Sequence, residues 1–446
     1  MIESINKTDI IEYWLTLYPE FKKEDDLIKH LEDSFNLSID DIVSKYLCEI
    51  EDIKKETFFS FDDYNNCTFL SFYKKFINDN IMYFLKVVSK SKLLKNKKEF
   101  IKDIVTQLCN KLYLICERTL ILEMNTCKEN GLLECKTADE KLKYFEKHLL
   151  DNEQYRENLY SDYPELVKLL NSIANNFFIY VSEIIIHTEN NIDAITKMNC
   201  TSGSLGKLKS IKIGSGDTHC YGKSVSKLHF EKCIIIYKPR NLTSDIQFQK
   251  ILNIINENNV LNNVKFKTIN MFTTNDMGWM DYIDYAECKN EFEVQEYYFK
   301  IGSLLCLLYV FNAVDMHFEN IIANGPHPYI IDLESLFHVC LKMKLLDPSS
   351  SQNRAIDYIQ RSVSSVGLLP SKITIGKSGQ KRSISVGGLD LVEGQKNFLK
   401  TNFLDKSNLD NIKMNLKEIT ISEKENVPMF NGKKINSFQY KDNIIN

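Results

Sequence analysis

Up to about residue 198, hydrophobic residues recur three or four positions apart, which is the repeat of an amphipathic helix. One such series consists of Phe100, Ile101, Ile104, Val105, Leu108, Leu112 and Ile115. A second runs from Glu165 to Ile184, directly after Pro164, and proline is common at the first position of a helix. The pattern predicts a helical region over 1–198 that contains no recognisable chemistry and serves as a scaffold or lid.

Beyond residue 198 the pattern changes to short alternating or apolar runs separated by turns, which is typical of strands. Strands are expected at Val225–Phe230, Cys233–Lys238, Lys265–Phe272 and Trp279–Ile283. Helical spacing returns over Asp245–Ile255 and Glu291–Asn312. The chain is therefore predicted to be an α+β protein, with a second domain over 199–446. That domain divides into a strand-rich lobe, 199–285, and a helical lobe, 286–446.

Glycine usage supports the same division, because fifteen of the sixteen glycines lie beyond residue 200. The 446 residues include 56 Lys and Arg against 60 Asp and Glu, a formal charge of −4, with 43% hydrophobic residues. This composition excludes a disordered or collagen-like chain. The slight acidity argues against a nucleic-acid-binding protein, which normally has a basic domain or stripe.

Twelve cysteines occur without a CxxC pair, and the chain opens without a signal segment. We therefore expect mostly buried, reduced thiols in a cytoplasmic protein. Cys220 beside His219, and Cys340 near His338, are isolated pairs, so no zinc site is expected. No run approaches the ~18 apolar residues of a membrane span. The longest apolar runs are interpreted as buried helices.

The strongest chemical signal follows the helix at Glu291–Asn312. Asp315 precedes Asn320 by five residues, the spacing of a catalytic base and a metal ligand in protein-kinase catalytic loops. A short hairpin then leads to Asp332, a second oxygen ligand suited to Mg²⁺. Phosphoryl transfer needs these groups, since it depends on orienting the attacking hydroxyl and holding Mg²⁺ on the phosphates.

Matching parts lie upstream. Gly214 and Gly216 form a glycine loop before the first expected strand, and Lys238 ends an apolar strand, as the nucleotide-binding lysine of kinases does. The segment from Trp279 to Ile283 would be the hinge between the lobes, with Asp281 and Ile283 beside the nucleotide base. Each feature alone has a simpler explanation, such as a turn or an exposed lysine, but their order predicts a nucleotide-dependent phosphotransferase. The sequence does not determine the acidic partner of Lys238, for which Asp245 and Glu257 are candidates.

These motifs resemble the dehydratase region of LanM-type (class II) lanthionine synthetases. The resemblance is dense from about residue 199 and rests on four stretches: Ser215–His219, Ile236–Arg240, Asn312–Phe337 and Gly367–Pro370. It implies a lipid-kinase-like, two-lobed domain after the helical region. It also implies lantibiotic biosynthesis, in which ATP and Mg²⁺ are used to phosphorylate Ser and Thr of a ribosomal precursor peptide, followed by phosphate elimination.

The resemblance also implies roles for individual residues. Lys238 would hold the nucleotide phosphates, Asp315 would be the base, and His317 would support the transferred phosphate. Asn320 and Asp332 would bind Mg²⁺. Asp217 and His219 lie in a loop typical of the family and would have a supporting role.

The family usually continues with an Arg- and Thr-containing elimination segment and a zinc-dependent cyclase domain, and neither has an equivalent here. Elimination by this chain alone is therefore doubtful, and cyclisation is not expected. Three explanations stay open: a fragment, a split gene product acting with a separate cyclase, or a degenerate copy. The alternative functions are a kinase that stops at the phosphopeptide, or a non-catalytic peptide-binding remnant.

Overall fold

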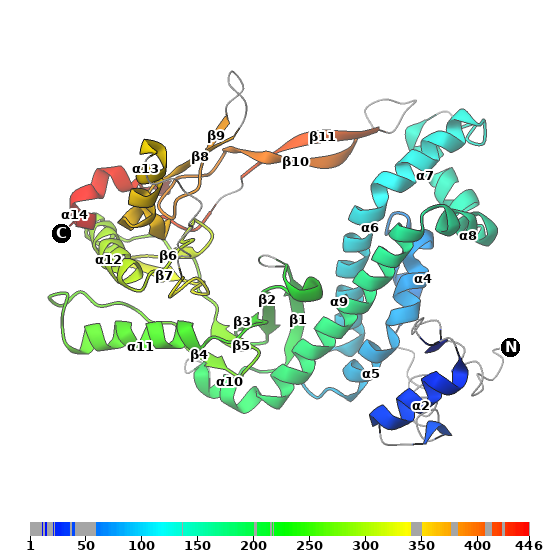
Figure 1. Cartoon of the computed structure of the whole chain (residues 1–446), viewed down its shortest axis with the longest axis horizontal. Helices are drawn as coiled ribbons and strands as arrows, with labels where there is room; N and C mark the ends of the chain where they lie inside the picture. The colour runs from blue at the N-terminus through cyan, green and yellow to red at the C-terminus, as the bar shows by residue number, and fades with distance from the viewer. Residues whose placement is uncertain are drawn as a thin grey trace.

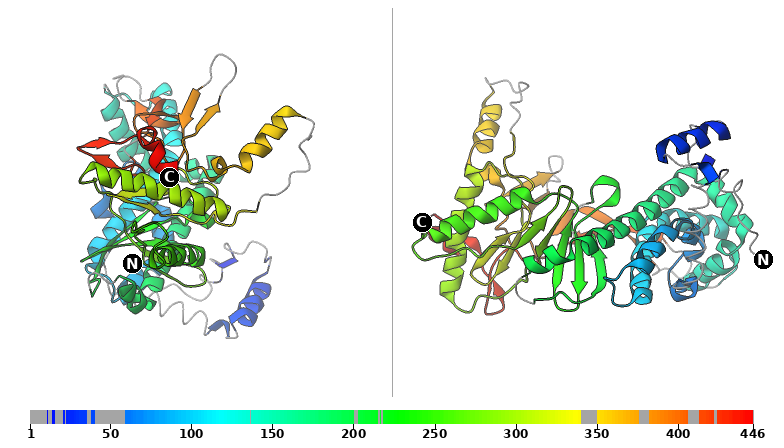
Figure 2. Two further views of the ribbon diagram at one scale, coloured as in Figure 1. Left: turned by 90° about the vertical axis from the view of Figure 1, so that its left-hand side faces the viewer. Right: turned by 90° about the horizontal axis from the view of Figure 1, so that it is seen from below.

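A computed structural model gives the arrangement of the chain (Figure 1). It describes residues 11, 14–15, 21, 23–35, 38–40, 59–135, 137–199, 203–214, 216, 218–339, 350–375, 382–405, 413–421 and 424–445. The protein is a mixed α+β structure, as predicted. Helices gather toward one end, a small sheet lies between, and hairpins and helices form the other end (Figures 1 and 2).

The N-terminal part is helical throughout its described residues. Its long helices extend beyond the predicted series: Asn96 caps the N-terminus of one, and Pro164 opens the other. The elements are α2 (Glu24–Phe35), η1 (Phe61–Tyr64), α4 (Leu70–Asn80), α5 (Met82–Lys90), α6 (Lys97–Glu129), α7 (Ala138–Tyr144), the π-helical turn η2 (Phe145–Leu150), α8 (Glu153–Asp162), α9 (Pro164–Asn190) and α10 (Ile192–Met198).

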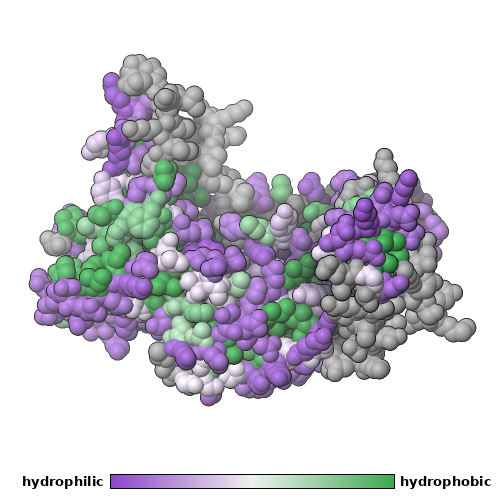
Figure 3. All heavy atoms as spheres, turned by 60° about the horizontal axis from the view of Figure 1, so that its bottom comes forward, coloured by the Kyte–Doolittle hydropathy of each residue, from purple (hydrophilic) through white to green (hydrophobic). Residues whose placement is uncertain are grey.

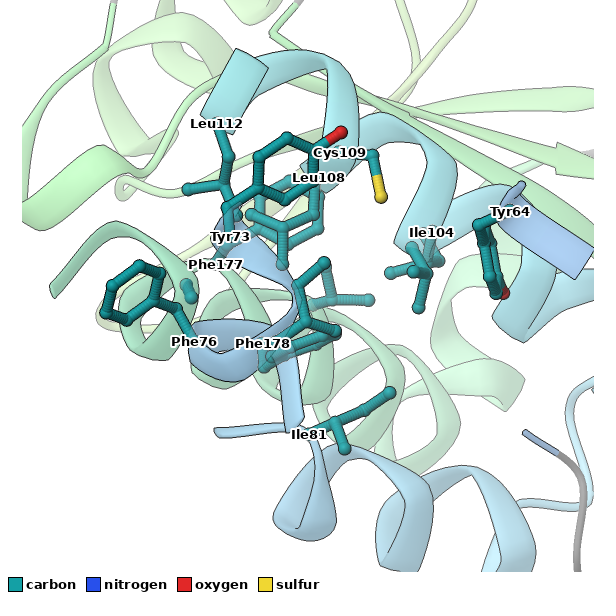
Figure 4. Close-up of a cluster of buried hydrophobic side chains, with 14 of the residues drawn as sticks. Tyr64, Tyr73, Phe76, Ile81, Ile104, Leu108, Cys109, Leu112, Phe177 and Phe178 are labelled. Atoms are coloured by element: carbon teal, nitrogen blue, oxygen red, sulfur yellow. The ribbon is translucent and has the colours of Figure 1, made fainter. Parts of the chain in front are cut away.

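An aromatic-rich core holds these helices together (Figure 4). Phe178 of α9 is 1% exposed and stacks on Phe84 of α5, with ring centroids 5.3 Å apart. Tyr73 and Phe76 of α4 and Leu108 of α6 point into the same cluster. Burying each such side chain contributes roughly 1.5–3 kcal/mol.

Helix α9 is the one helix in the described ranges that is long and apolar enough to cross a membrane, by length and composition alone. Half of its most apolar window is buried, and it packs against α4, α5 and α6. Core helices of folded domains meet the same criterion, and the packing of α9 is that of a core helix.

A five-stranded antiparallel sheet follows, in the order β1-β2-β3-β5-β4. Three predicted strands are confirmed. In place of the strand expected at Lys265–Phe272, only Met271–Thr273 forms a strand. Strand β1 was not predicted. The elements are β1 (Leu208–Ile213), η3 (Cys220–Gly222), β2 (Ser226–Phe230), β3 (Ile234–Lys238), α11 (Thr243–Glu257), β4 (Met271–Thr273) and β5 (Gly278–Asp281).

One face of the sheet belongs to the core of the helical region. Leu208, Leu228 and Trp279 are part of the same buried cluster as the helices. Trp279 Nε1 donates to Thr188 of α9 at 3.2 Å, and Gln107 of α6 bonds to the backbone of β1. The sheet and the helices therefore share one core across residue 198.

The C-terminal part is built on α12, against which the β6–β7 hairpin, η4 and α14 pack. Most of the chain after α13 forms hairpins rather than the expected helices, and β11 reaches α6 of the helical region. The elements are α12 (Glu291–Val310), β6 (Ile321–Asn324), β7 (His327–Ile330), α13 (Ser351–Gln360), η4 (Val363–Val366), β8 (Lys372–Ile375), β9 (Arg382–Ser385), β10 (Lys396–Asp405), β11 (Lys413–Thr420), β12 (Met429–Phe430), β13 (Lys433–Lys434), η5 (Ser437–Tyr440) and α14 (Lys441–Ile445).

Hydrophilic residues dominate the face of the molecule drawn in Figure 3, with hydrophobic residues gathered over the C-terminal part. This mixed surface agrees with the near balance of charges in the sequence. The sequence features that carry chemistry lie between the sheet and the C-terminal part.

Candidate active site

A cavity of about 840 Å³ lies between the sheet and the β6–β7 hairpin. Nine of the eleven predicted site residues line it: Gly216, His219, Lys238, Asp281, Ile283, Asp315, His317, Asn320 and Asp332. Gly214 lies at the end of β1 but is not among the lining residues, and Asp217 lies outside the described residues. Residues more than 100 positions apart in the sequence thus meet around one space.

The glycine loop connects β1 to β2, so the prediction that it precedes the first strand is wrong. Gly214 has φ +85°, a conformation that favours glycine, and its N–H donates to Ser224 Oγ at 3.0 Å. Helix α9 holds the far side of the loop, because Glu183 pairs with Lys223 at 2.6 Å and Tyr180 donates to the Ser224 carbonyl. The helical region therefore fixes this edge of the cavity.

Lys238, at the end of β3, is 3% exposed. Its Nζ donates to the Ile331 carbonyl at 2.6 Å and lies 3.3 Å from Asp332 Oδ2. Burial lowers the pKa of Lys238, and the Asp332 carboxylate opposes that shift. Burial alone would raise the pKa of Asp332, but the charges of Lys238 and Arg240 bring it below its ordinary value. These two cations therefore favour the ionised form of Asp332.

The acidic partner of Lys238 is Asp332, so neither Asp245 nor Glu257 has that role. Asp245 is completely buried and pairs instead with Arg240. Glu257 ends α11, at the opposite end from Asp245, which lies in its first turn. Sequence reasoning gave Arg240 no function. Its position two residues after Lys238 was the available signal.

The loop before β6 has an unusual backbone. Asp315 has φ +63°, and its carbonyl accepts from the His317 N–H at 2.9 Å and from Asn320 Nδ2 at 2.8 Å. The second bond uses the amide nitrogen of Asn320, which leaves the amide oxygen as the atom suited to a hard cation. The loop thus holds Asp315, His317 and Asn320 on one wall of the cavity.

The β6–β7 hairpin brings the two predicted metal ligands together. Ile321 is paired with Ile330, and the Ile331 N–H donates to the Asn320 carbonyl at 2.9 Å, so Asp332 follows directly beside Asn320. An amide oxygen and an ionised carboxylate fit Mg²⁺, which prefers oxygen ligands and takes only one or two carboxylates from a protein. A larger ligand set, three or more His, Cys, Asp or Glu side chains placed to hold a metal ion together, does not occur among the described residues.

Two glycines to which sequence reasoning gave no structural role, Gly367 and Gly388, allow the chain after α13 to approach the Asp315 loop closely. Gly367 has φ +82°, and a Cβ there would lie 3.1 Å from the Met316 nitrogen. A Cβ on Gly388 would lie 2.5 Å from the Met316 carbonyl oxygen. The Met316 N–H in turn donates to the Val366 carbonyl at 2.9 Å. The segment after α13 therefore packs tightly on the backbone of the Asp315 loop.

On the sheet side, Asp281 and Ile283 line the cavity. Both carboxylate oxygens of Asp281 are used within the protein, accepting from Asn199 at 3.1 Å and from Asn270 at 2.8 Å. Burial raises the pKa of Asp281 above its ordinary value. Its carboxylate is thus a structural group that fixes the end of β5.

The predicted cysteine–histidine pairs have different surroundings. His219 and Cys220 both line the cavity, and Cys220 is an exposed free thiol. Cys340 lies outside the described residues. All nine described cysteines are free thiols, but only four of them, Cys109, Cys116, Cys127 and Cys288, are buried, so the expectation that most are buried is not met among the described residues.

Comparison with known proteins gives one curated relative and one family. The lacticin 481/lactococcin biosynthesis protein LcnDR2 of Lactococcus lactis subsp. lactis is 29% identical over 262 residues, which cover 57% of this chain. The chain spans just over a quarter, 28%, of the length of that relative. Residues 163–446 match the family model described as a domain of unknown function, DUF4135. Since this match covers more than half of the chain and includes the whole cavity, the protein belongs to the DUF4135 family.

Proposed function

We propose that the cavity is the active site of an ATP-dependent peptide kinase of lanthipeptide biosynthesis. The observation that carries the proposal is the meeting of Lys238, Asp315, Asn320 and Asp332 around one space. The relative named for lacticin 481 and lactococcin biosynthesis supports the substrate class, a ribosomally made precursor peptide. The proposed place of action is the cytoplasm.

Each residue has a defined task in this proposal. Lys238, once released from Asp332, binds the nucleotide phosphates, and Asp315 orients the peptide Ser or Thr hydroxyl and accepts its proton. His317 supports the transferred phosphoryl group. Asn320 and Asp332 provide the oxygen ligands for Mg²⁺, which would neutralise charge on the phosphates when bound.

The proposed reaction transfers the terminal phosphoryl group of ATP to the hydroxyl oxygen, giving ADP and a phosphopeptide. Elimination of that phosphate to a dehydroamino acid is the second proposed step, and the peptide product decides whether this chain performs it. A kinase that stops at the phosphopeptide is the alternative.

To test the proposal, the full chain is incubated with ATP, Mg²⁺ and a Ser/Thr/Cys-containing precursor peptide. The mass of the peptide is then measured by mass spectrometry. A gain of phosphate marks the kinase, and a loss of water marks kinase plus elimination. Asp315→Asn, which keeps the shape of the side chain, should lower transfer at least ~100-fold, the scale of general-base catalysis. Asp357→Asn on the exposed surface of α13 is the matched control, and full activity of Asp315→Asn would refute the assignment.

A further inference from the structure

The guanidinium of Arg240 lies between two carboxylates, that of Asp245, which is completely buried, and that of Asp332, which lines the cavity. On one side it donates two hydrogen bonds to Asp245, with Nη1 2.8 Å from Oδ2 and Nη2 3.1 Å from Oδ1. On the other side Nη2 lies 2.7 Å from Asp332 Oδ1. Arg240 lies two residues after Lys238, the last residue of β3.

Asp245 keeps Arg240 in this place. Its carboxylate is completely buried, in the first turn of α11, and Arg240 is the cation that pairs with it. Leaving a buried carboxylate without its partner is strongly unfavourable. The two-pronged pairing also fixes the plane of the guanidinium, since both of its terminal nitrogens are used. Arg240 is therefore held whether or not Asp332 contacts it.

The two oxygens of Asp332 consequently differ. Oδ1 contacts the fixed guanidinium at 2.7 Å, whereas Oδ2 faces the Lys238 ammonium at 3.3 Å. Lys238 has a flexible stem and a second acceptor, the Ile331 carbonyl, so its ammonium can leave Oδ2 and keep a hydrogen bond within the protein. Oδ1 is thus anchored, and Oδ2 is the oxygen that can be exchanged.

Charge would work against this arrangement if Arg240 stood alone, because a cation on a metal ligand opposes metal binding. Asp245 offsets that charge, and Glu334 adds a weaker contact, 3.6 Å from Arg240 Nε. Two cations, Lys238 and Arg240, then face three carboxylates, which leaves the cluster with a net negative charge. A divalent cation is attracted by that surplus.

We infer that Arg240, held by Asp245, is a positioning residue that anchors Asp332 Oδ1 so that Oδ2 ligates the divalent cation. The inference rests on the proposed function of the same cavity. Asp245 acts only through Arg240, and neither residue touches the peptide. Groups that hold a metal ligand in place typically change metal affinity 10–100-fold.

The test measures binding of Mn²⁺ to the full chain by electron paramagnetic resonance, in the presence of a non-hydrolysable ATP analogue. Arg240→Gln is expected to weaken Mn²⁺ binding about 10–100-fold. Arg240→Lys keeps the charge but loses the two-pronged geometry, so it should show most of the same loss. Tighter or unchanged binding in Arg240→Gln would overturn the inference, since Arg240 would then be a competing cation or a bystander.

Asp245→Asn tests whether Asp245 affects metal binding only through Arg240. It should weaken Mn²⁺ binding, and the double variant Arg240→Gln/Asp245→Asn should bind no worse than Arg240→Gln alone. An additive loss in the double variant would contradict an effect exerted only through Arg240. The double variant also removes both buried charges together, so it stays informative if a single variant folds poorly.

Two controls separate this inference from the proposed function. Arg361→Gln breaks an exposed arginine–aspartate pair, with Arg361 Nε 2.9 Å from Asp357, and should leave Mn²⁺ binding unchanged. A wild-type chain that binds neither Mn²⁺ nor the analogue would overturn the proposed function itself. A wild-type chain that binds both, with variants that bind equally well, would overturn only the role of Arg240.

Discussion

The core of the helical region and the surroundings of the cavity beside the sheet bury different kinds of side chain. The core around Phe178 buries aromatic and aliphatic side chains, whose removal from water stabilises the fold. At the cavity, Lys238 is buried in the wall and Asp245 is buried behind Arg240, and the desolvation of both opposes folding unless they are paired. A connected cluster of paired charges, Lys238, Arg240, Asp245 and Asp332, therefore distinguishes the candidate site from the aromatic core.

The largest effect on stability is expected in the scaffold. Phe178→Ala should lower the free energy of unfolding by about 3–5 kcal/mol, because it removes a fully buried ring that stacks on Phe84. Urea unfolding followed by circular dichroism measures this. Leu122→Ala on the exposed face of α6, where Leu122 is 59% exposed, is the control and should change stability by less than about 0.5 kcal/mol. A loss of stability below about 1 kcal/mol for Phe178→Ala would contradict the view that burial in the aromatic core stabilises the fold.

At the cavity the effects on stability and function should separate. Lys238→Met keeps the length of the side chain and removes its charge, while Asp332 retains Arg240 as a partner. Phosphate transfer should fall about 100-fold, as for the loss of a preorganised charge at a transition state, with stability changed by less than about 1 kcal/mol. Lys168→Met, on an exposed pair of α9, is the control. A large loss of stability with activity kept would assign Lys238 to the scaffold.

The backbone contact behind the Asp315 loop should give an intermediate effect. Gly367→Ala places a Cβ at φ +82° and 3.1 Å from the Met316 nitrogen, and should lower stability by about 1–2 kcal/mol. Gly131→Ala is the matched control, since Gly131 has φ +74° with nothing within 4 Å. The difference between the two variants, measured by thermal unfolding, isolates the contact from the backbone conformation. Equal losses would show that the contact adds nothing.

The smallest effect is a dependence on pH. His327 Nδ1 lies 2.9 Å from Nζ of the buried Lys300, and burial, followed by the charge of Lys300, lowers the pKa of His327 to about 4. The unfolded chain binds this proton near pH 6.5, so stability falls as the pH drops from about 6.5 toward 4. The loss should be on the order of 1 kcal/mol for a half-buried ring.

Comparing urea unfolding of the wild type and His327→Gln at pH 7 and pH 4.5 isolates this contribution. The variant should lose less stability between the two pH values than the wild type does. An identical loss in both proteins would show that His327 titrates alike in the folded and unfolded chains.

Sequence reasoning succeeded where one rule dominates. Helices α6, α9 and α12 follow their apolar spacing, and the Asp315–Asn320 loop and its hairpin follow residue order. Strand β1 was missed because Lys209 and Lys212 interrupt its apolar positions, and a register irregularity near Leu208 disturbs the alternation. Pairing with β2, a contact distant in sequence, decides that segment.

The partners of charged residues were less predictable. Asp332 lies 94 positions after Lys238, and only the folded hairpin brings them to 3.3 Å. The pairing of Asp245 with Arg240 likewise depends on how α11 leaves the sheet. Residue types and spacing therefore predicted most of the residues that meet around the cavity, whereas the choice between competing ion pairs required the tertiary structure.

The core that α9 shares with the sheet has a consequence for how the protein can be divided. A fragment beginning at residue 199 would present the buried faces of Leu208, Leu228 and Trp279 to water, and we expect it to aggregate. The segment matched by the family begins at residue 163, immediately before α9. The segment shared with the family thus includes one helix of the helical region, and we expect an exchange of this segment between relatives to give a folded chain only when that helix is exchanged with it.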